Sequence, residues 1–273
     1  MAKGDENQTQ KRAVVTGGGG AILGATATRL AADGFRVAVW DLSIEKARHT
    51  VDGIRQGGGD AVAVQCDVTS HDSVTAALND TLAQLDTVDL LVNGAGGSHA
   101  RTTTSPDLSF FHLNPDDIRK VMDLNYLSIV MCCQAVGRVM AERGTGAIVN
   151  ITSVAGIQPL TRALAYCNGK AAANSFTQWL AVHMNQVYSK QIRVNAVAPG
   201  FVLTEQNRFL LIDAETGALT ERGEQVLQAV PAGRYGTPEE VAELVAFLSS
   251  EHAAFINGAV VPVDGGFLAY AGV

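Results

Sequence analysis

Two side chains four residues apart, Tyr166 and Lys170, form the pair in this sequence best suited to proton transfer. On a helix, positions i and i+4 lie on one face, so the phenol and the ammonium would be neighbours. A nearby positive charge favours the phenolate and lowers a tyrosine pKa from about 10 toward the working range. Such a phenol suits general acid and base chemistry between a carbonyl and an alcohol. Ser153, which follows a predicted strand, could donate a hydrogen bond to the reacting oxygen.

A cluster of glycines, residues 17–20, lies between a predicted strand over 12–16 and a predicted helix over 21–33. Glycine lets backbone N–H groups approach a pyrophosphate closely, and the start of a helix adds partial positive charge. No Gly-Lys-Ser/Thr sequence follows, which excludes a nucleoside triphosphatase loop. The context therefore indicates a dinucleotide-binding turn, although a plain turn would also use glycines.

An acidic residue, Asp41, ends the second predicted strand at the spacing expected for a carboxylate that binds the adenosine ribose hydroxyls. Its charge would repel a 2′-phosphate. We therefore expect NAD(H) to be preferred over NADP(H). The alternative is that Asp41 only caps the following helix.

The elements that would position these residues alternate regularly along the chain. Strands are predicted over 12–16, 36–40, 61–65, 88–92, 147–151, 192–197 and 259–263. Helices are predicted over 21–33, 43–56, 70–85, 116–143, 164–187 and 237–249. This order predicts an α/β, doubly wound parallel sheet of about seven strands with helices on both faces, a single-domain Rossmann fold over 12–273 after a flexible N-terminus over 1–11.

Two stretches interrupt the alternation, residues 97–114 and residues 201–230. Both follow predicted strands. Ligands of open α/β sheets bind beyond the carboxyl ends of the strands, so either stretch could shape a substrate pocket or be a surface insertion.

The ordered set of motifs resembles the short-chain dehydrogenase/reductase family over nearly the whole chain from about residue 12. The motifs are Thr16-Gly17 with its glycine loop, Asp67-Val68, Asn93-Gly94-Ala95-Gly96, Asn125, Ser153, Tyr166-x-x-x-Lys170, Pro199-Gly200 and Val263-Asp264-Gly265-Gly266. The resemblance implies a catalytic set of Asn125, Ser153, Tyr166 and Lys170. In that set, Tyr166 transfers the proton, Lys170 binds the nicotinamide ribose and lowers the tyrosine pKa, Ser153 orients the substrate oxygen, and Asn125 holds a water.

The resemblance also implies which residues line the cofactor groove. They are Gly17, Gly19, Gly20, Ala21, Ile22, Asp41, Asp67, Val68, Asn93, Ala95, Gly96, Tyr166, Lys170, Pro199, Gly200, Val202 and Thr204. Asn93 could instead serve only to tie strands together. One departure from the family is that Ala21 and Leu23 occupy the second and third glycine positions of the loop. The bulkier Leu23 predicts that the first helix starts differently or lies farther from the sheet.

A narrower resemblance, to bacterial D-mannonate oxidoreductases (fructuronate reductases) of the short-chain type, concerns the substrate. It rests on segments 159–162, 176–184 and 204–211, on the ending from Val263 to Val273, and on the long insertion after Gly97. It implies a polar hydroxy or keto acid. Guanidinium groups match carboxylates bidentately, and amides match sugar hydroxyls. The substrate candidates are Arg162, Gln206, Asn207 and Arg208. Both arginines could equally be surface or subunit-contact charges.

Two alternatives remain open. One is another oxidoreductase of this scaffold, such as a 3-oxoacyl-thioester reductase or a polyol dehydrogenase. The other is a non-catalytic nucleotide-sensing protein, whose expected mark is loss of the Tyr/Lys pair.

Composition excludes several other classes. The 273 residues are 47% hydrophobic and carry a formal net charge of −7, which fits a globular protein and disfavours nucleic acid as a partner. We expect no membrane span, because no purely apolar run reaches the required length, and no signal peptide in the polar first twelve residues. The four cysteines and six histidines show no metal-ligand spacing, so we expect no metal and reduced thiols in a cytoplasmic protein. Long helices with many small and apolar residues, together with the resemblance, suggest a homotetramer.

Overall fold

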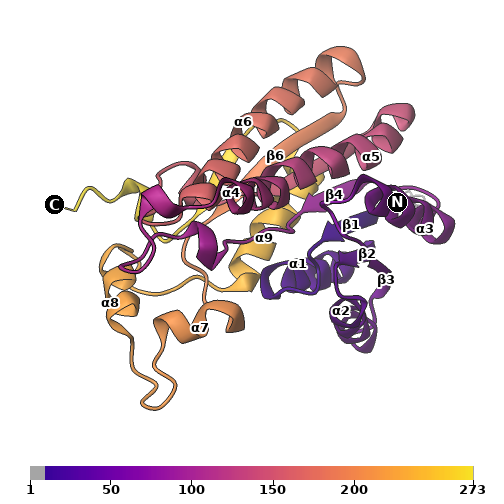
Figure 1. Ribbon diagram of the computed structural model, residues 1–273. Helices are drawn as coiled ribbons and strands as arrows, with labels where there is room; N and C mark the ends of the chain where they lie inside the picture. Colours follow the sequence, from indigo (N-terminus) through magenta and orange to yellow (C-terminus); the bar gives the residue numbers. More distant parts are fainter. Residues whose placement is uncertain (1–9, 273) are drawn as a thin grey trace.

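A single parallel sheet organises the molecule (Figure 1). The computed structural model describes residues 10–272, apart from the side chains of Gln206 and Phe209, so most of the predicted flexible terminus lies outside the described residues. The strand order is β3-β2-β1-β4-β5-β6-β7, and every neighbouring pair is parallel. The strands are β1 (Arg12–Thr16), β2 (Arg36–Asp41), β3 (Asp60–Gln65), β4 (Leu90–Asn93), β5 (Gly146–Ile151), β6 (Ile192–Pro199) and β7 (Val260–Val263). The predicted single-domain Rossmann-type α/β fold is confirmed.

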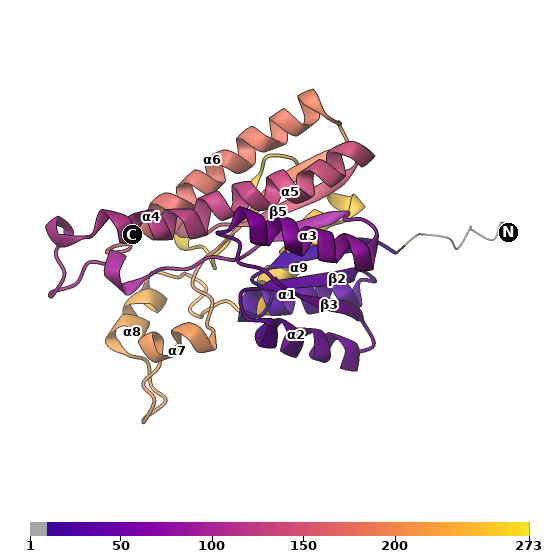
Figure 2. The same cartoon turned by 45° about the vertical axis from the view of Figure 1, so that its right-hand side comes forward.

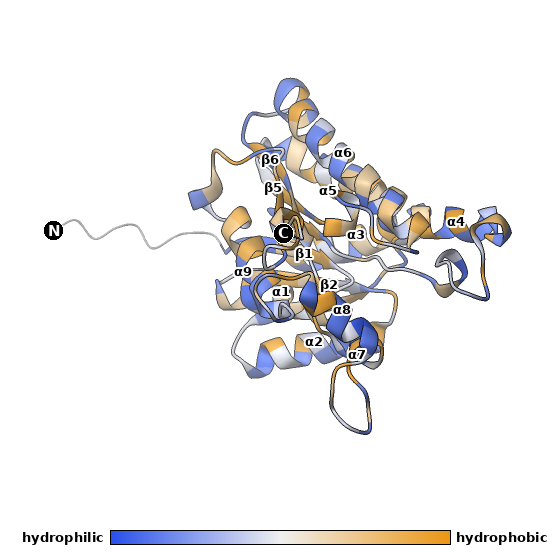
Figure 3. Cartoon of the chain, turned by 90° about the vertical axis from the view of Figure 1, so that its left-hand side faces the viewer, coloured by the Kyte–Doolittle hydropathy of each residue, from blue (hydrophilic) through white to orange (hydrophobic). Residues whose placement is uncertain are grey.

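Helices cover both faces of this sheet (Figure 2). On one face, α3 (His71–Leu85), α5 (Ser128–Arg143) and α6 (Leu164–Val187) share a core cluster with the strands. On the other face, α1 (Ala21–Ala32), α2 (Ile44–Gln56) and α9 (Pro238–Ser249) do the same. Successive strand residues point to opposite faces, so Val14 joins the first cluster and Val15 the second. Burial on both faces explains why these strands read as continuous apolar runs, and Figure 3 shows them between the two layers.

The parallel arrangement brings the carboxyl ends of all seven strands to one edge of the sheet. Thr16, Asp41, Asn93, Ile151 and Pro199 end five of these strands. Every loop that carries a predicted site residue therefore leaves the sheet at the same edge.

The largest departures from the sequence prediction lie outside the regular alternation. The predicted helix over 116–143 is divided into α4 (Pro115–Met122), a π-helical turn η3 (Asp123–Leu127) and α5. Residues 201–230, predicted only as an interruption, contain α7 (Glu205–Leu211) and α8 (Glu221–Gln228). These two helices are short and project from the body of the molecule (Figure 1).

One helix bears on the expectation of no membrane span, which stays a prediction. The continuous helical stretch Pro115–Arg143 is long and apolar enough by length and composition alone. However, its residues Ile129, Cys133 and Met140 pack in the core cluster beneath the sheet. This stretch is therefore a core helix of the folded domain.

Candidate active site

Tyr166 and Lys170 lie on the first two turns of α6, as their spacing predicts. The Lys170 Nζ atom is 5.7 Å from the centre of the Tyr166 ring. Lys170 is 4% exposed, and its ammonium donates a hydrogen bond of 2.9 Å to the Ile151 carbonyl at the end of β5. This bond fixes the amine against the sheet, beside the half-buried phenol.

Burial is the largest influence on the pKa values of both Lys170 and Tyr166. It lowers the pKa of Lys170 to about 8, because a charged amine loses solvation there. Burial also raises the pKa of Tyr166, and a hydrogen bond with the Ser153 side chain opposes that shift. The predicted lowering of the Tyr166 pKa by Lys170 is therefore wrong for this structure: desolvation outweighs the other influences on the phenol.

Ser153 reaches the same place from β5. It directly precedes the 3-10 turn η4 (Val154–Gly156), and its hydroxyl accepts a hydrogen bond of 3.1 Å from the Ala155 N–H. This local cap holds the hydroxyl in place for its hydrogen bond with the Tyr166 side chain. A hydroxyl and a phenol therefore converge where a substrate oxygen could contact both.

Asn125 occupies the π-helical turn between α4 and α5 and is fully buried. Its Nδ2 donates to the Gly97 carbonyl at 2.7 Å and to the Val121 carbonyl at 2.9 Å, and its Oδ1 accepts from the Gly97 N–H at 3.0 Å. Such π-helical turns occur frequently at functional sites. Here the turn joins the helix to the loop that follows β4.

Gly169, on α6, allows close packing against Asn125. A Cβ placed there would lie 2.9 Å from the Cβ of Asn125, too close for any real side chain to be accepted without movement. Glycine therefore lets α6 approach the π-helical turn. A glycine inside a predicted helix, which costs about 1 kcal/mol, was the available signal.

The glycine loop is built as a phosphate cradle. Helix α1 begins at Ala21, with Gly20 at its N-cap, and no side chain caps its first N–H groups. Uncapped N–H groups and the helix dipole suit an anion such as a pyrophosphate. The Thr16 hydroxyl accepts hydrogen bonds from Gly94 N–H at 3.0 Å and Ala95 N–H at 3.3 Å, which ties the end of β1 to the loop after β4.

The Leu23 departure is accommodated by a neighbouring loop. The Leu23 side chain is 6% exposed and occupies the space over Gly94, where an added Cβ would overlap its Cγ and both Cδ atoms. Helix α1 consequently starts where it was predicted, at Ala21. The predicted alternatives, a different helix start or a helix farther from the sheet, are not needed to fit Leu23.

Asp41 points back to the glycine loop. Its Oδ2 accepts a hydrogen bond of 2.9 Å from the Gly19 N–H, and its Oδ1 accepts one of 3.0 Å from the Ser43 N–H. The N-cap of α2 is Ser43, whose hydroxyl accepts from Lys46 N–H. Asp41 is therefore more than a helix cap, because it places a carboxylate beside the loop.

The remaining predicted cofactor residues follow the strands. Asp67 and Val68 come after β3, and the Asp67 carboxylate accepts from both the N–H and the hydroxyl of Thr69. Asn93 is buried at the end of β4, where its Nδ2 donates to Asn150 Oδ1 at 2.9 Å, so it does tie strands together. The others are Ile22 in α1, Ala95 and Gly96 after β4, Pro199 and Gly200 at the end of β6, Val202, and Thr204 at the N-cap of α7.

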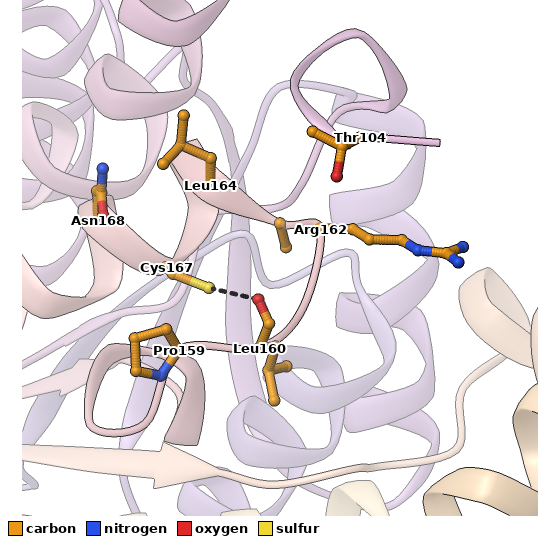
Figure 4. A pocket seen from close by; sticks show the side chains of 8 residues that line it. Thr104, Pro159, Leu160, Arg162, Leu164, Cys167 and Asn168 are labelled. Carbon is orange, nitrogen blue, oxygen red and sulfur yellow. Dashed lines mark hydrogen bonds between the residues drawn. The ribbon is translucent and has the colours of Figure 1, made fainter. Parts of the chain in front are cut away.

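The structure separates the four substrate candidates. Arg162 is exposed, has a left-handed backbone with φ of 74°, and holds Thr104 of the 97–114 stretch through a 3.0 Å backbone hydrogen bond. It lines a cavity of about 230 Å³ with Leu160 and Cys167, and its guanidinium points away from Cys167 (Figure 4). Its role toward a substrate stays a prediction.

The other three candidates lie on α7. Arg208 is exposed, and the Gln206 side chain lies outside the described part of the chain. The Asn207 amide accepts from Thr204 N–H and donates to the Val202 carbonyl, both at 2.8 Å. Because the helix cap occupies both polar atoms of Asn207, its predicted contact with sugar hydroxyls would require breaking that cap.

Comparison with known proteins agrees with this geometry. A family model described as "Enoyl-(Acyl carrier protein) reductase" matches residues 20–268. An uncharacterized oxidoreductase of Bacillus subtilis is 38% identical, over 98% of this chain and 98% of the relative. This chain belongs to the short-chain dehydrogenase/reductase family.

Other members of this family bear names of several activities. A provisionally assigned D-mannonate oxidoreductase from Haemophilus influenzae, with bound NAD, has a TM-score of 0.90 and 38% identity, over 96% of each chain. A provisionally assigned gluconate 5-dehydrogenase from Beutenbergia cavernae, with bound NADP, has a TM-score of 0.83 and 31% identity, over 95% of this chain and 97% of that one. A 3-oxoacyl-[acyl-carrier-protein] reductase from Synechocystis is 36% identical, over 96% of this chain and 98% of the relative.

Membership of the short-chain dehydrogenase/reductase family makes this chain an oxidoreductase. Its Tyr/Lys pair, whose loss would mark a non-catalytic sensor, is present and lies beside Ser153. The named substrates of its relatives range from sugar acids to carrier-bound thioesters. The substrate must therefore be argued from this chain's own residues.

Proposed function

We propose that this protein is an NAD-dependent oxidoreductase that interconverts a secondary alcohol and a ketone on a small sugar acid of the D-mannonate/D-fructuronate type. The observation that carries the proposal is the convergence of Ser153, Tyr166 and Lys170 beside the loop after β4. These are the groups that position and move a proton at an oxygen. They lie at the same edge of the sheet as the glycine loop.

Tyr166 is the proposed general acid and base. In the oxidation direction it takes the hydroxyl proton of the alcohol, and in reduction it returns a proton to the carbonyl oxygen. Ser153 donates a hydrogen bond to the same oxygen and so orients it. Lys170 lies beside the phenol and would bind the nicotinamide ribose.

The residues of the groove fit a dinucleotide. The uncapped N-terminus of α1 would hold the pyrophosphate, and Asp41 would accept hydrogen bonds from the adenosine ribose. Asp67 and Val68 would lie at the adenine, Pro199, Gly200, Val202 and Thr204 at the nicotinamide, and Lys170 at its ribose. The nicotinamide ring supplies the hydride acceptor or donor when it is bound. The NAD bound to the relative from Haemophilus influenzae supports the preference for NAD(H).

Three observations support a small polar acid as the substrate. The two cavities, both lined by residues of the segment that follows Ser153 in the chain, have volumes of about 230 and 250 Å³, which suits a small molecule. Both are lined by arginine, the side chain best matched to a carboxylate. Two relatives of solved structure are named for sugar acids.

A 3-oxoacyl-thioester reductase is the second candidate. The description of the matching family model and the relative from Synechocystis favour it. Such substrates require an extended apolar channel, and the small volumes of the two cavities oppose that. A polyol dehydrogenase could use the same small cavities but would not need the arginine that lines each of them.

The test is an absorbance assay at 340 nm with NAD and NADP against D-mannonate, other aldonates, neutral polyols and, in reverse, fructuronate and a 3-oxoacyl thioester. We expect the highest kcat/KM for a sugar acid with NAD. A higher kcat/KM for the thioester with NADPH would contradict the proposal and favour the second candidate. If a polyol were the best substrate, the protein would still be an oxidoreductase, but the proposed sugar-acid substrate would be wrong.

We also propose a cytoplasmic homotetramer. Helix α6 carries the stacked aromatic rings of Phe176, Trp179 and His183, and Tyr188 packs against the last. Phe176 and His183 are half-buried. Trp179 is 58% exposed and Val182 55%. An apolar helix face of this kind is best covered by a second copy of the same chain.

A further inference from the structure

A second cavity, of about 250 Å³, lies between α8 and the segment that follows β5. Gln158 and Thr161 line it from the segment after Ser153, and Phe201 lines it directly after Gly200. Its two walls therefore continue, along the chain, from the catalytic serine and from the loop proposed to flank the nicotinamide. Arg222 and Gln225 close it from α8.

One side of the cavity is apolar and fixed. The rings of Phe201 and Phe267 meet edge to face with centres 5.3 Å apart. Phe267 is held in place because the Asp264 carboxylate accepts hydrogen bonds of 2.9 Å from Gly266 N–H and Leu268 N–H. This wall would contact the carbon skeleton of a ligand rather than its polar groups.

The opposite side carries the charge. Among the described residues that line the cavity, Arg222 alone is charged. No carboxylate in the described part of the chain lies within ion-pair distance of it. Its sequence neighbour Glu221 instead accepts a hydrogen bond from Gln225 Nε2 at 3.2 Å.

Helix α8 is anchored at the turn that presents Arg222. The Thr220 hydroxyl accepts from Gly223 N–H at 3.0 Å, and the Tyr235 hydroxyl donates to the Gly223 carbonyl at 3.0 Å. Gly223 also packs so closely on the Leu211 carbonyl that an added Cβ would overlap it. These contacts fix the backbone of the turn from which the Arg222 side chain extends.

We propose that Arg222 binds the carboxylate of the substrate and that this cavity is the acid-binding end of the site, with Gln225 at an adjacent hydroxyl. The proposal rests on the proposed function and makes it specific. A volume near the lower limit of about 300–1,000 Å³ for small-molecule sites matches a compact polyhydroxy acid. Arg222 was not among the residues predicted from the sequence, where Arg208, the other arginine of the 201–230 stretch, was the candidate.

The experiment compares the wild-type enzyme with Arg222→Met, Arg222→Lys, Arg162→Met and Lys190→Met. Lys190→Met is the charge-matched control, since Lys190 is exposed before β6 at the opposite edge of the sheet. With saturating NAD, kcat/KM is measured for the best sugar acid and for the neutral polyol that lacks its carboxylate. The Kd of NADH is measured by fluorescence, and thermal melts establish folding.

We expect Arg222→Met to lower kcat/KM for the acid by about 10- to 100-fold, the range for a charge-assisted hydrogen bond lost. Its kcat/KM for the polyol and its Kd for NADH should stay within about twofold of wild type, as should every value of Lys190→Met. The kcat/KM of Arg222→Lys for the acid should lie between those of wild type and Arg222→Met, because the lysine ammonium keeps the charge but loses the planar, bidentate geometry of the guanidinium.

Two outcomes overturn the proposal in distinguishable ways. If the wild type turns over a sugar acid and Arg222→Met has the same kcat/KM for that acid as Lys190→Met, the carboxylate binds elsewhere while the proposed function stands. A loss confined to Arg162→Met would then assign it to the first cavity. If the wild type turns over polyols or thioesters and no sugar acid, both the proposed function and this subsite are wrong.

Discussion

Lys170 shows how strongly burial acts on a single side chain at this site. Its amine has one hydrogen-bond partner in the described structure, the Ile151 carbonyl, and its pKa falls to about 8. An unfolded lysine titrates near 10.5. The charged form is therefore disfavoured by folding, and the site retains it below about pH 8 only at a cost in stability.

This cost predicts a pH dependence of stability. Between about pH 8 and 10.5 the unfolded chain binds more protons at Lys170 than the folded chain, so the unfolding free energy rises with pH in that window. Lys170→Met removes the dependence. Between pH 7 and 10, we expect the unfolding free energy of wild type to rise by up to roughly 3 kcal/mol more than that of Lys170→Met. Paired denaturant titrations measure both values. An unchanged difference would show that the Lys170 pKa is not lowered.

Asp41 predicts the choice of cofactor. Its carboxylate lies against the Gly19 N–H, where the negative charge of a 2′-phosphate would be repelled. Asp41→Ser should weaken NADH binding and strengthen NADPH binding, so that the ratio of their Kd values moves by about tenfold or more. Fluorescence titration measures both constants. If wild type already binds NADPH more tightly than NADH, the preference is wrong.

The sequence predicted that Ser153, Tyr166 and Lys170 lie together, because motif spacing and strand order bring them to one edge of the sheet. The sequence could not predict the hydrogen-bond partners or the burial of each side chain. The pKa of Tyr166 moves upward, since the degree of burial at α6 depends on packing from distant segments. The Asn207 amide caps α7 because Thr204 and Val202 are nearer than any ligand.

At the scale of elements, Leu23 and Gly94 join α1 to the loop after β4. The Leu23 side chain fills the space that any side chain at position 94 would need, so a leucine at position 23 requires a glycine at position 94. Neither position alone indicates this, since the two residues are 71 apart in the chain and meet only once β1 pairs with β4.

A double-mutant cycle tests this pairing. Gly94→Ala should destabilise the protein by about 1–3 kcal/mol through overpacking. In Leu23→Ala/Gly94→Ala the added methyl has room, so the double variant should be more stable than the sum of the single effects predicts. Chemical denaturation and the Kd of NADH provide two readouts. Strictly additive effects would contradict a direct contact.

Element boundaries followed from pattern where the pattern was regular. Helix α6 lies at its predicted residues, and Ser43 and Ser70 cap α2 and α3. Helices α7 and α8 were not predicted, because each is short and their mixed composition gives no sustained 3.6-residue period. The π-helical turn at Asn125 depends on tertiary contacts with Gly97 and is equally invisible in the sequence.

At the scale of the whole molecule, the aromatic face of α6 remains open in the single chain. Trp179 stacks on His183 with ring centres 4.7 Å apart while leaving more than half its surface exposed. We expect Trp179→Asp to shift the assembly from tetramers toward smaller species, since it buries a charge in the proposed contact. Analytical ultracentrifugation measures this. A wild-type monomer would contradict the tetramer.

The most direct test of the central claim compares wild type with Tyr166→Phe, which removes only the phenolic hydroxyl. We predict that the variant binds NADH with an unchanged Kd and loses about 10²- to 10⁴-fold in kcat, as expected for removal of a general acid and base. The measurement is turnover at 340 nm alongside NADH fluorescence on the same samples. If Tyr166→Phe kept more than about a tenth of the wild-type kcat, Tyr166 would not be the proton-transfer residue, and the chemistry assigned to this site would be wrong.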